Sequence, residues 1–388
     1  MATGCGRARR RAGVWLALAL VSALGAAAAT AAVRPPRALH AVPVTPAAAT
    51  GAKAWWRAGF AGRGVDVAVV DTGVAPVAGL SSSVVKGPDL AGRGGATGAR
   101  DGYGHGTFVA SLVHGVAPAA RIVDVKVGAA DGSTDAARVV AGIDWVVRHA
   151  HEGGLDIRVL NLSLGTRPDV PPELDPVAAA AENAWRHGIV VVAAAGNDGH
   201  AGLADPADAT DVVAVGAADA RGTATAADDA VAPYSSEATT PSQRHPDLVA
   251  PGSHLLGLRV PGSLLDRSHP DGRVGDRFFR GSGTSEAAAL VSGATALVLQ
   301  RYPQLSPAEV KAFLARGAVR LDAPAAAQGA GELRLPRLLR LVPERRPVPR
   351  RPGHRVPTPA VQPVQSGDVW AGSSWTSESW LGSTWGLH

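Results

Sequence analysis

The feature that most restricts the fold is a series of short, almost wholly apolar segments that alternate with helical patterns between residues 65 and 300. Segments that are apolar throughout are typical of strands buried on both faces, as in parallel sheets covered by helices. The expected strands are residues 65–70, 121–127, 158–164, 189–195 and 211–215, and the expected helices are residues 105–114, 135–150, 175–187 and 285–300. The sequence therefore predicts an α/β fold with a doubly wound, mostly parallel central sheet and helices on both faces.

Two of the later helices carry additional signals. The pattern over residues 285–300 is apolar on every side, so we expect this helix to be buried. The segment Ser306-Pro307-Ala308-Glu309 has the form of a capping box with proline at the first helical position. It predicts a surface helix that begins there and ends near Gly317.

The N-terminal segment has the features of a secretory signal peptide. A basic start, MATGCGRARRR, is followed by an apolar run and by small residues around Ala29 that suit a signal peptidase, so residues 1–32 are predicted to be removed. The alternative is a membrane anchor, but the apolar run is short for a bilayer span. The sole cysteine, Cys5, would leave with this segment, so we expect no disulfide and no cysteine nucleophile or thiolate metal site. The sequence thus predicts a secreted protein, either extracellular or associated with the cell envelope.

The rest of the chain divides by composition. A short Pro/Ala-rich segment at residues 33–50 precedes the domain expected over residues 51–342, and residues 343–365 form a Pro/Arg-rich linker. The tail, residues 366–388, is rich in Trp, Gly and Ser and places tryptophan at every fifth position, which fits neither the helical nor the strand period. Two interpretations stay open: a low-complexity tail without a fold, or a surface that stacks on cell-wall sugars beside the basic linker.

The positive charge is confined to the two ends of the chain. The formal net charge is +5, but the predicted signal peptide and the region after residue 333 hold an excess of Arg that leaves the middle of the chain negative. A nucleic-acid-binding protein needs its basic residues gathered on the folded domain. We therefore expect no nucleic-acid partner.

Four short motifs contain candidate catalytic residues. Asp71 ends the first predicted strand in VAVVDTG, and Asn197 follows a later strand in VVVAAAGNDG. His105 lies between glycines in DGYGHGTFVAS, and Ser285 begins the predicted buried helix in GSGTSEAAALVSG. In open α/β sheets, active sites form outside the carboxyl ends of the strands, where this reading places Asp71 and Asn197.

Acyl transfer at neutral pH needs a hydroxyl nucleophile, a base, an anion that orients the base, and a donor for the oxygen that becomes negative. Ser285, His105, Asp71 and Asn197 supply one of each. Taken alone, each has an ordinary explanation, such as a turn, an exposed histidine, a helix cap or a loop. Their joint occurrence on one predicted sheet indicates a serine hydrolase.

In these motifs and in their order, Asp, His, Asn, Ser, the chain resembles the subtilisin-like serine proteases (subtilases) over about residues 54–317, including GVAPAARIVDVKV and LNLSLG. The resemblance implies that Asp71 orients His105, that His105 is the general acid and base, and that Ser285 is the nucleophile. It also implies an oxyanion hole formed by Asn197 with the Ser285 amide. Two backbone strips would bind substrate as an added strand: Ser163, Leu164 and Gly165, and Ala194, Ala195 and Gly196.

The sequence departs from the family pattern at three positions near the motifs. Glu286 replaces the usual Met after the nucleophile, Ala289 replaces a Pro, and Phe108 replaces a common His. None of these changes removes a catalytic group. A carboxylate at residue 286 would favour the protonated form of His105. Only a short segment separates the predicted signal peptide from the domain, whereas family members usually have a folding prodomain there.

We expect protein or peptide substrates, no cofactor and a monomeric protein. Family members often bind calcium, and acidic residues occur in loops here, but no metal-ligand spacing supports a site; these residues are Asp205, Asp208, Asp228 and Asp229. An aspartic protease, which also uses D-T-G, is excluded because the motif occurs once and the α/β pattern does not fit. The alternative from another class is a catalytically inactive subtilase-like binding protein of the cell envelope.

Overall fold

The computed structural model describes residues 44–92, 101–165, 175–221, 227–344, 374–375 and 384–385. The predicted signal peptide, the linker from residue 345 onward and most of the tail lie outside these residues. Within the described ranges, no helix has both the length and the apolar character needed to cross a bilayer.

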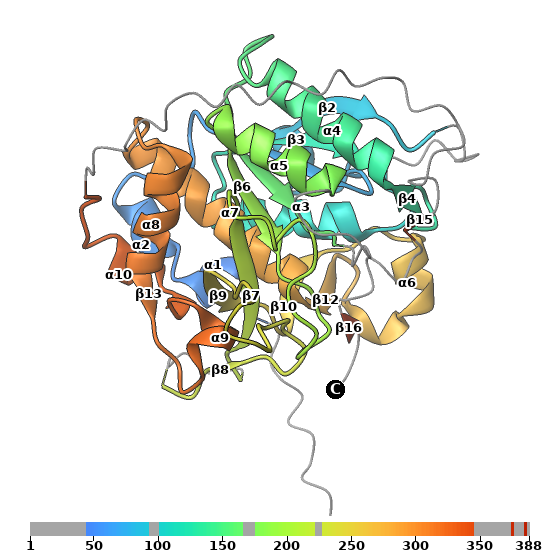
Figure 1. Cartoon of the computed structure of the whole chain (residues 1–388). Coiled ribbons are helices and arrows are strands. Elements are labelled where there is room, and N and C mark those ends of the chain that lie inside the picture. Colours follow the sequence, from blue (N-terminus) through green and yellow to red (C-terminus); the bar gives the residue numbers. More distant parts are fainter. Residues whose placement is uncertain are drawn as a thin grey trace, which may run out of the picture. The chain divides into compact units, whose positions relative to one another are not determined.

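A ten-stranded sheet forms the centre of the domain, with the order β13-β14-β9-β7-β6-β5-β1-β3-β2 and β8 paired to β7 (Figure 1). All neighbouring strands are parallel except the pairs β13/β14 and β7/β8. The strands are β1 (Asp66–Asp71), β2 (Val84–Asp89), β3 (Arg121–Lys126), β5 (Ile157–Leu162), β6 (Val190–Ala194), β7 (Val213–Asp219), β8 (Ala230–Val231), β9 (Leu248–Pro251), β13 (Ala318–Val319) and β14 (Glu332–Leu333).

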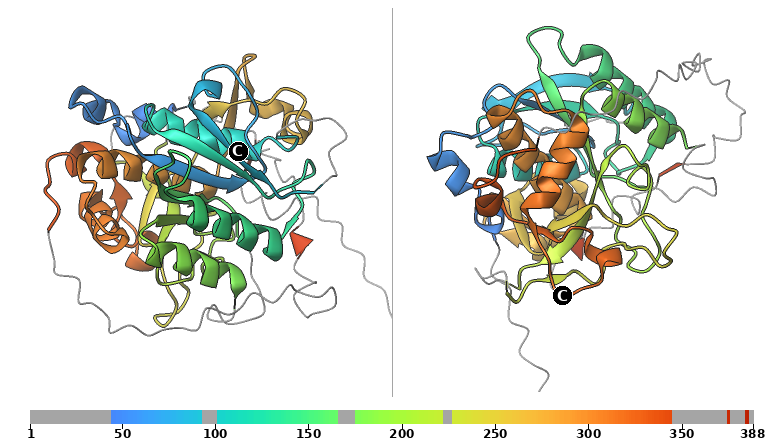
Figure 2. Two further views of the ribbon diagram at one scale, coloured as in Figure 1. Left: turned by 90° about the horizontal axis from the view of Figure 1, so that it is seen from above. Right: turned by 60° about the vertical axis from the view of Figure 1, so that its left-hand side comes forward.

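Helices cover both faces of this sheet (Figures 1 and 2). On one face lie α3 (His105–Val116) and α7 (Thr284–Arg301), and on the other lie α4 (Ala136–His149) and α5 (Pro176–Arg186). Close packing of α7 against α3 requires Gly293, because a Cβ there would lie 2.7 Å from the Val116 Cβ and 2.9 Å from the Val113 carbonyl oxygen. This arrangement confirms the predicted doubly wound α/β fold.

The predicted helix signals agree with the structure. In α7 every residue from Thr284 to Leu299 is buried, as its apolar pattern predicts. The helix α8 (Pro307–Gly317) begins with the predicted capping box, in which Glu309 accepts from the Ser306 amide and donates its own amide to the Ser306 hydroxyl. One strand lies later than predicted: β7 spans residues 213–219 and not 211–215, because small buried residues extend it toward its carboxyl end.

A second, smaller sheet lies beside the first and contains β10 (Leu255–Leu258), β12 (Phe278–Ser282), β11 (Arg273–Val274) and β16 (Thr384–Trp385). A two-stranded sheet pairs β4 (Thr134–Asp135) with β15 (Ser374–Trp375). The remaining elements are α1 (Pro46–Thr50), α2 (Lys53–Arg57), η1 (Ser81–Ser83), α6 (Leu264–Ser268), η3 (Pro270–Gly272), α9 (Ala325–Gln328) and α10 (Leu335–Leu338).

The N-terminal and C-terminal parts of the domain are tied together. The completely buried Trp55 in α2 donates its indole N–H to the Leu335 carbonyl oxygen of α10 at 2.7 Å. Helix α1 packs against α3, and Val44 bridges to Leu255 in β10. The packed structure therefore includes residues before the domain boundary expected at residue 51.

Candidate active site

Asp71 and His105 form a buried carboxylate–imidazole pair at the carboxyl edge of the sheet. Asp71 is the last residue of β1 and His105 is the first residue of α3. The His105 Nδ1 atom lies 2.8 Å from Asp71 Oδ1 and 3.0 Å from Oδ2, and both residues are completely buried. The Thr72 amide also donates to Asp71 Oδ1 at 2.7 Å. Two donors thus fix the carboxylate, which in turn fixes the imidazole ring.

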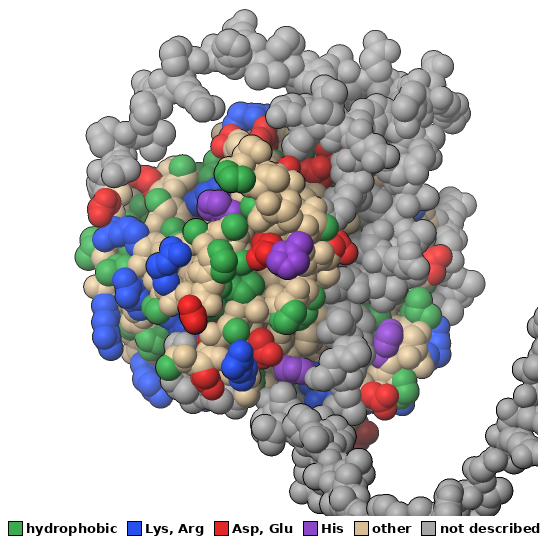
Figure 3. Space-filling view, turned by 60° about the horizontal axis from the view of Figure 1, so that its bottom comes forward, with side chains coloured by type: hydrophobic (Ala, Val, Ile, Leu, Met, Phe, Trp, Pro, Cys, Tyr) green, Lys and Arg blue, Asp and Glu red, His purple; other side chains and the backbone are tan. Residues whose placement is uncertain are grey.

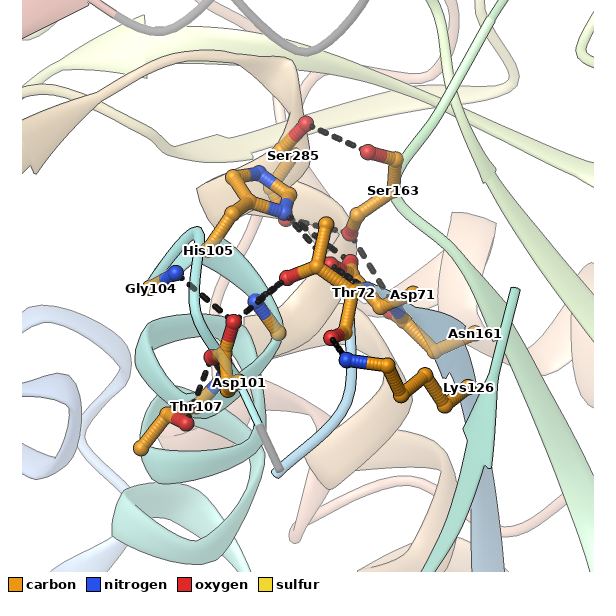
Figure 4. A network of polar contacts seen from close by, with 11 residues as sticks. Asp71, Thr72, Asp101, Gly104, His105, Thr107, Lys126, Asn161, Ser163 and Ser285 are labelled. Carbon is orange, nitrogen blue, oxygen red and sulfur yellow. Dashed lines mark hydrogen bonds and ion pairs between the residues drawn. The ribbon is translucent and has the colours of Figure 1, made fainter. Parts of the chain in front are cut away.

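The loop before α3 holds His105 in place. Gly104 has φ of 106°, a conformation that a residue with a side chain rarely adopts, and its amide donates to Asp101 Oδ1 at 2.7 Å. Asp101 is completely buried and accepts three further hydrogen bonds: from the Thr72 hydroxyl at 2.9 Å, the Thr107 amide at 2.8 Å and the Thr107 hydroxyl at 2.6 Å (Figure 4). One carboxylate therefore joins the residues on both sides of His105 to the end of β1.

The protonation of His105 depends on three nearby carboxylates. Burial alone would lower the pKa of His105, because the charged imidazolium loses its hydration. The opposite effect of the Asp71 charge and hydrogen bond, with smaller contributions from the charges of Glu286 and Asp101, prevails and raises the pKa of His105 above its usual value. The site thus stabilises the imidazolium form of His105.

Ser285 lies in the first turn of α7 and is 6% exposed. Its hydroxyl donates to the Ser163 carbonyl oxygen at 3.0 Å, and the Ser163 hydroxyl donates to the Ser285 carbonyl oxygen at 3.0 Å. Figure 4 shows the His105 imidazole with Ser285 on one side and Asp71 on the other. Because the hydroxyl has one proton, a hydrogen bond from Ser285 to the imidazole requires that the hydroxyl give up the Ser163 carbonyl oxygen. Contacts of this kind are often formed only when substrate is bound.

Asn197 follows β6 and contacts Thr284, the residue before Ser285. Its carboxamide oxygen accepts a hydrogen bond from the Thr284 amide at 2.8 Å, and the Gly196 amide donates to the Thr284 hydroxyl at 3.1 Å. With its oxygen engaged in this way, the Nδ2 end of Asn197 is the donor end, next to the N-terminus of α7. Helix N-termini carry unsatisfied amides and a positive dipole end, which favour negative charge.

The first predicted substrate strip follows β5, the second begins at the last residue of β6, and both converge on one alanine. A Cβ at Gly165 would lie 2.9 Å from the Ala204 Cβ, and a Cβ at Gly196 would lie 3.2 Å from the same atom. The other members of the strips are buried: Ser163, Leu164, Ala194 and Ala195. Glycine at both positions therefore allows the strip ends to approach Ala204 closely.

The structure brings Asp71 and His105 into direct contact, and it also adds residues that the motifs did not reveal. Asp101, Thr72 and Thr107 position His105, and Asn161 supports Ser163 by donating to its hydroxyl at 2.9 Å. The signal for Asp101 is its place just before the glycine-flanked histidine, but an Asp-Gly pair usually indicates a turn. Among the described residues, no group of three or more His, Cys, Asp or Glu side chains could hold a metal ion.

Comparisons with known proteins agree with this geometry. The model of the subtilase family matches residues 62–331. The chain is 38% identical to serine protease AprX from Bacillus subtilis (strain 168), over 66% of this chain and 61% of that protein, so it spans less than two thirds of that relative's length. It is 33% identical to subtilisin DY from Bacillus licheniformis, over 68% of this chain and 86% of that protein. The crystal structure of a cold-adapted subtilisin-like serine proteinase superposes with a TM-score of 0.55 at 27% identity, over 71% of this chain and 90% of that one.

Proposed function

Because this chain belongs to the subtilase family, we propose that it is a serine endopeptidase that hydrolyses peptide bonds through an acyl-enzyme intermediate. The observation that carries the proposal is the buried pair of Asp71 and His105 beside Ser285, with 2.8 Å between the imidazole Nδ1 and the carboxylate. A buried imidazole oriented by a carboxylate next to a helix-terminal serine has the components of an acylating site.

In the proposed reaction, His105 takes the hydroxyl proton of Ser285 as the oxygen attacks the substrate carbonyl carbon. Asp71 stabilises the resulting imidazolium, which is consistent with the raised pKa of His105. His105 then gives the proton to the leaving amine, whose C–N bond breaks and leaves the acyl group on Ser285. A water molecule, deprotonated by His105, hydrolyses this ester and restores the hydroxyl. The steps need no cofactor.

Asn197 Nδ2 and the Ser285 amide are proposed to donate hydrogen bonds to the oxyanion of the tetrahedral intermediates. The carboxamide contact with the Thr284 amide, at 2.8 Å, supports this role because it holds the side chain beside the nucleophile. Donors fixed in advance stabilise the transition state without reorganisation. Substrate is proposed to add as a strand to the strips at residues 163–165 and 194–196.

We further propose that residues 51–342 are the catalytic domain and that the protein is exported after removal of residues 1–32. The signal-like N-terminus supports export. The mass of the protein recovered from a secreting host tests it: we expect a mature chain that begins near residue 33, and an intact N-terminus on the recovered protein would contradict export by cleavage.

On the face shown in Figure 3, basic side chains are interspersed with acidic ones.

A fluorophosphonate probe tests the proposed activity. Such probes phosphonylate a serine only where a base and an oxyanion hole activate its hydroxyl. We expect labelling of the wild-type protein and none of Ser285→Ala. A folded wild-type protein that resists labelling would contradict the proposal and favour the alternative, a catalytically inactive binding protein of the cell envelope.

A further inference from the structure

The edge of β4 lies beside the loop that holds His105. A Cβ at Gly132 would lie 2.8 Å from the nearest ring atom of the buried Tyr103, and a Cβ at Gly102 would lie 2.6 Å from the Ala130 Cβ. The segment leading into β4 therefore packs directly on the loop between Asp101 and His105. Among the described strands, β4 pairs only with β15 of the C-terminal tail, in an antiparallel register that sets Ser374 opposite Asp135 and Trp375 opposite Thr134.

The second edge belongs to β12, which leads through Gly283 and Thr284 to the nucleophile. Strand β10 pairs along one side of β12, where Leu255 is opposite Gly281. On the other side, β11 covers only Phe278 and Phe279. The final residues of β12 on that side, Gly281 and Ser282, pair antiparallel with Trp385 and Thr384 of β16.

Both tail strands thus pair with short backbone edges that adjoin the catalytic residues from two directions. One edge adjoins the His105 loop and the other leads to Ser285 (Figure 1). Each pairing is main-chain to main-chain and antiparallel, which is how an extended peptide adds to an exposed sheet edge. Unpaired edges of this kind accept any strand of suitable reach, whether it belongs to the same chain or to another.

We propose that the C-terminal tail is an intramolecular ligand of these two edges, where it competes with peptide substrates that extend beyond the strips at residues 163–165 and 194–196, so that the tail slows the cleavage of other chains. This inference rests on the proposed protease function. The occupant is the tail itself, through Ser374–Trp375 and Thr384–Trp385. The tail binds through its backbone in the orientation of an added strand, and it leaves the edges when a substrate takes its place.

The size of the effect follows from the tether. Pairings of two residues each are weak, but the tail belongs to the same chain as the edges, which gives it an effective concentration of about 1 mM there. Since competition divides kcat/KM by one plus the ratio of effective concentration to Kd, a tail whose Kd is about one tenth of its effective concentration lowers kcat/KM about tenfold. This inhibition is reversible, because the tail is held by backbone pairing alone.

The test compares two double variants of the full-length chain. Trp375→Pro with Trp385→Pro places proline in both tail strands, where it removes the backbone N–H that strand pairing uses. Trp370→Pro with Trp380→Pro makes the same change at the two tail tryptophans outside these strands and serves as the matched control. The measurements are kcat/KM for a fluorogenic peptide that extends beyond the two strips and labelling by a fluorophosphonate, with the mass of each preparation verifying that the tail is intact.

We expect the first variant to raise kcat/KM about tenfold and the control to change it less than twofold. Equal kcat/KM for the wild-type protein and the first variant, with normal fluorophosphonate labelling of both, would overturn the tail proposal and leave the protease function standing. An equal rise in both variants would also overturn it, because pairing at the two edges would then play no part. Absence of labelling in every preparation would instead overturn the protease function.

Discussion

The hydrogen bonds around Asp101 make a prediction that can be worked out in some detail. Each carboxylate oxygen accepts from one backbone amide and one hydroxyl: Oδ1 from Gly104 and Thr72, and Oδ2 from Thr107 alone. Asp101→Asn keeps the shape of the side chain but replaces one acceptor oxygen by a donor NH2 group. A hydroxyl can rotate and accept from that group, whereas a backbone N–H cannot.

Whichever way the new amide is oriented, one buried backbone N–H loses its acceptor. Such a loss costs about 1–3 kcal/mol, and the remaining hydrogen bonds lose the additional strength that a charged acceptor gives them. We therefore expect Asp101→Asn to lower the free energy of unfolding by about 2–4 kcal/mol. Since the same bonds hold the residues on both sides of His105, a displacement of the imidazole by about 1 Å is expected to lower kcat/KM about 100-fold.

The assay uses urea unfolding in a Ser285→Ala background, so that self-digestion does not interfere, and kcat/KM in the active background. Asp131→Asn is the matched control, because Asp131 also accepts from a backbone amide and a hydroxyl, those of Ser133, but is exposed. We expect this control to change stability by less than about 1 kcal/mol. Equal unfolding midpoints for the two variants, or full activity in Asp101→Asn, would refute the reasoning.

Three further predictions follow from individual contacts. Glu286→Gln removes a charge that raises the pKa of His105, so the acid limb of the kcat/KM profile, where His105 becomes protonated, is expected at lower pH than in wild type; coinciding profiles would contradict this. Asn197→Ala should lower kcat by about 10²–10³ with little change in KM, a magnitude taken from the removal of the oxyanion-hole asparagine in subtilisin; a change in KM alone would argue against an oxyanion role. Ser306→Ala removes a helix cap and should cost about 1 kcal/mol in urea unfolding, and an unchanged midpoint would show that the capping box adds no stability.

The sequence predicts the central sheet well because burial on both faces leaves an unambiguous pattern. Segments such as residues 189–195 are apolar throughout, because a strand covered by helices on both faces buries the side chains on both of its sides. The strands outside this pattern were not predicted. In β2, VVKGPD is only partly buried and contains Gly and Pro, and β10 to β12 are short segments whose pairing depends on contacts between distant parts of the chain.

For the site, the motifs predicted the pair of Asp71 and His105 but not the residues that hold this pair in place. Asp71, His105 and Ser285 occur in short glycine-rich sequences whose chemistry can be read locally. The supporting contacts link residues far apart in the chain, such as Thr72 to Asp101 and Ser163 to Ser285. Contacts of this kind depend on the register of the strands that carry them, which residue types alone do not determine.

The indole of Trp55 determines where the chain can be shortened. A cut after Leu341 leaves both members of its hydrogen bond in place, whereas a cut before Leu335 strips the acceptor from a donor that water does not reach. A buried N–H left without an acceptor lowers the free energy of unfolding by about 1–3 kcal/mol, in addition to any loss of packing. Proteolytic trimming of the C-terminus should therefore stop at a stable core that still contains α10. Loss of α10 would destabilise helix α2 as well, because α2 contains Trp55.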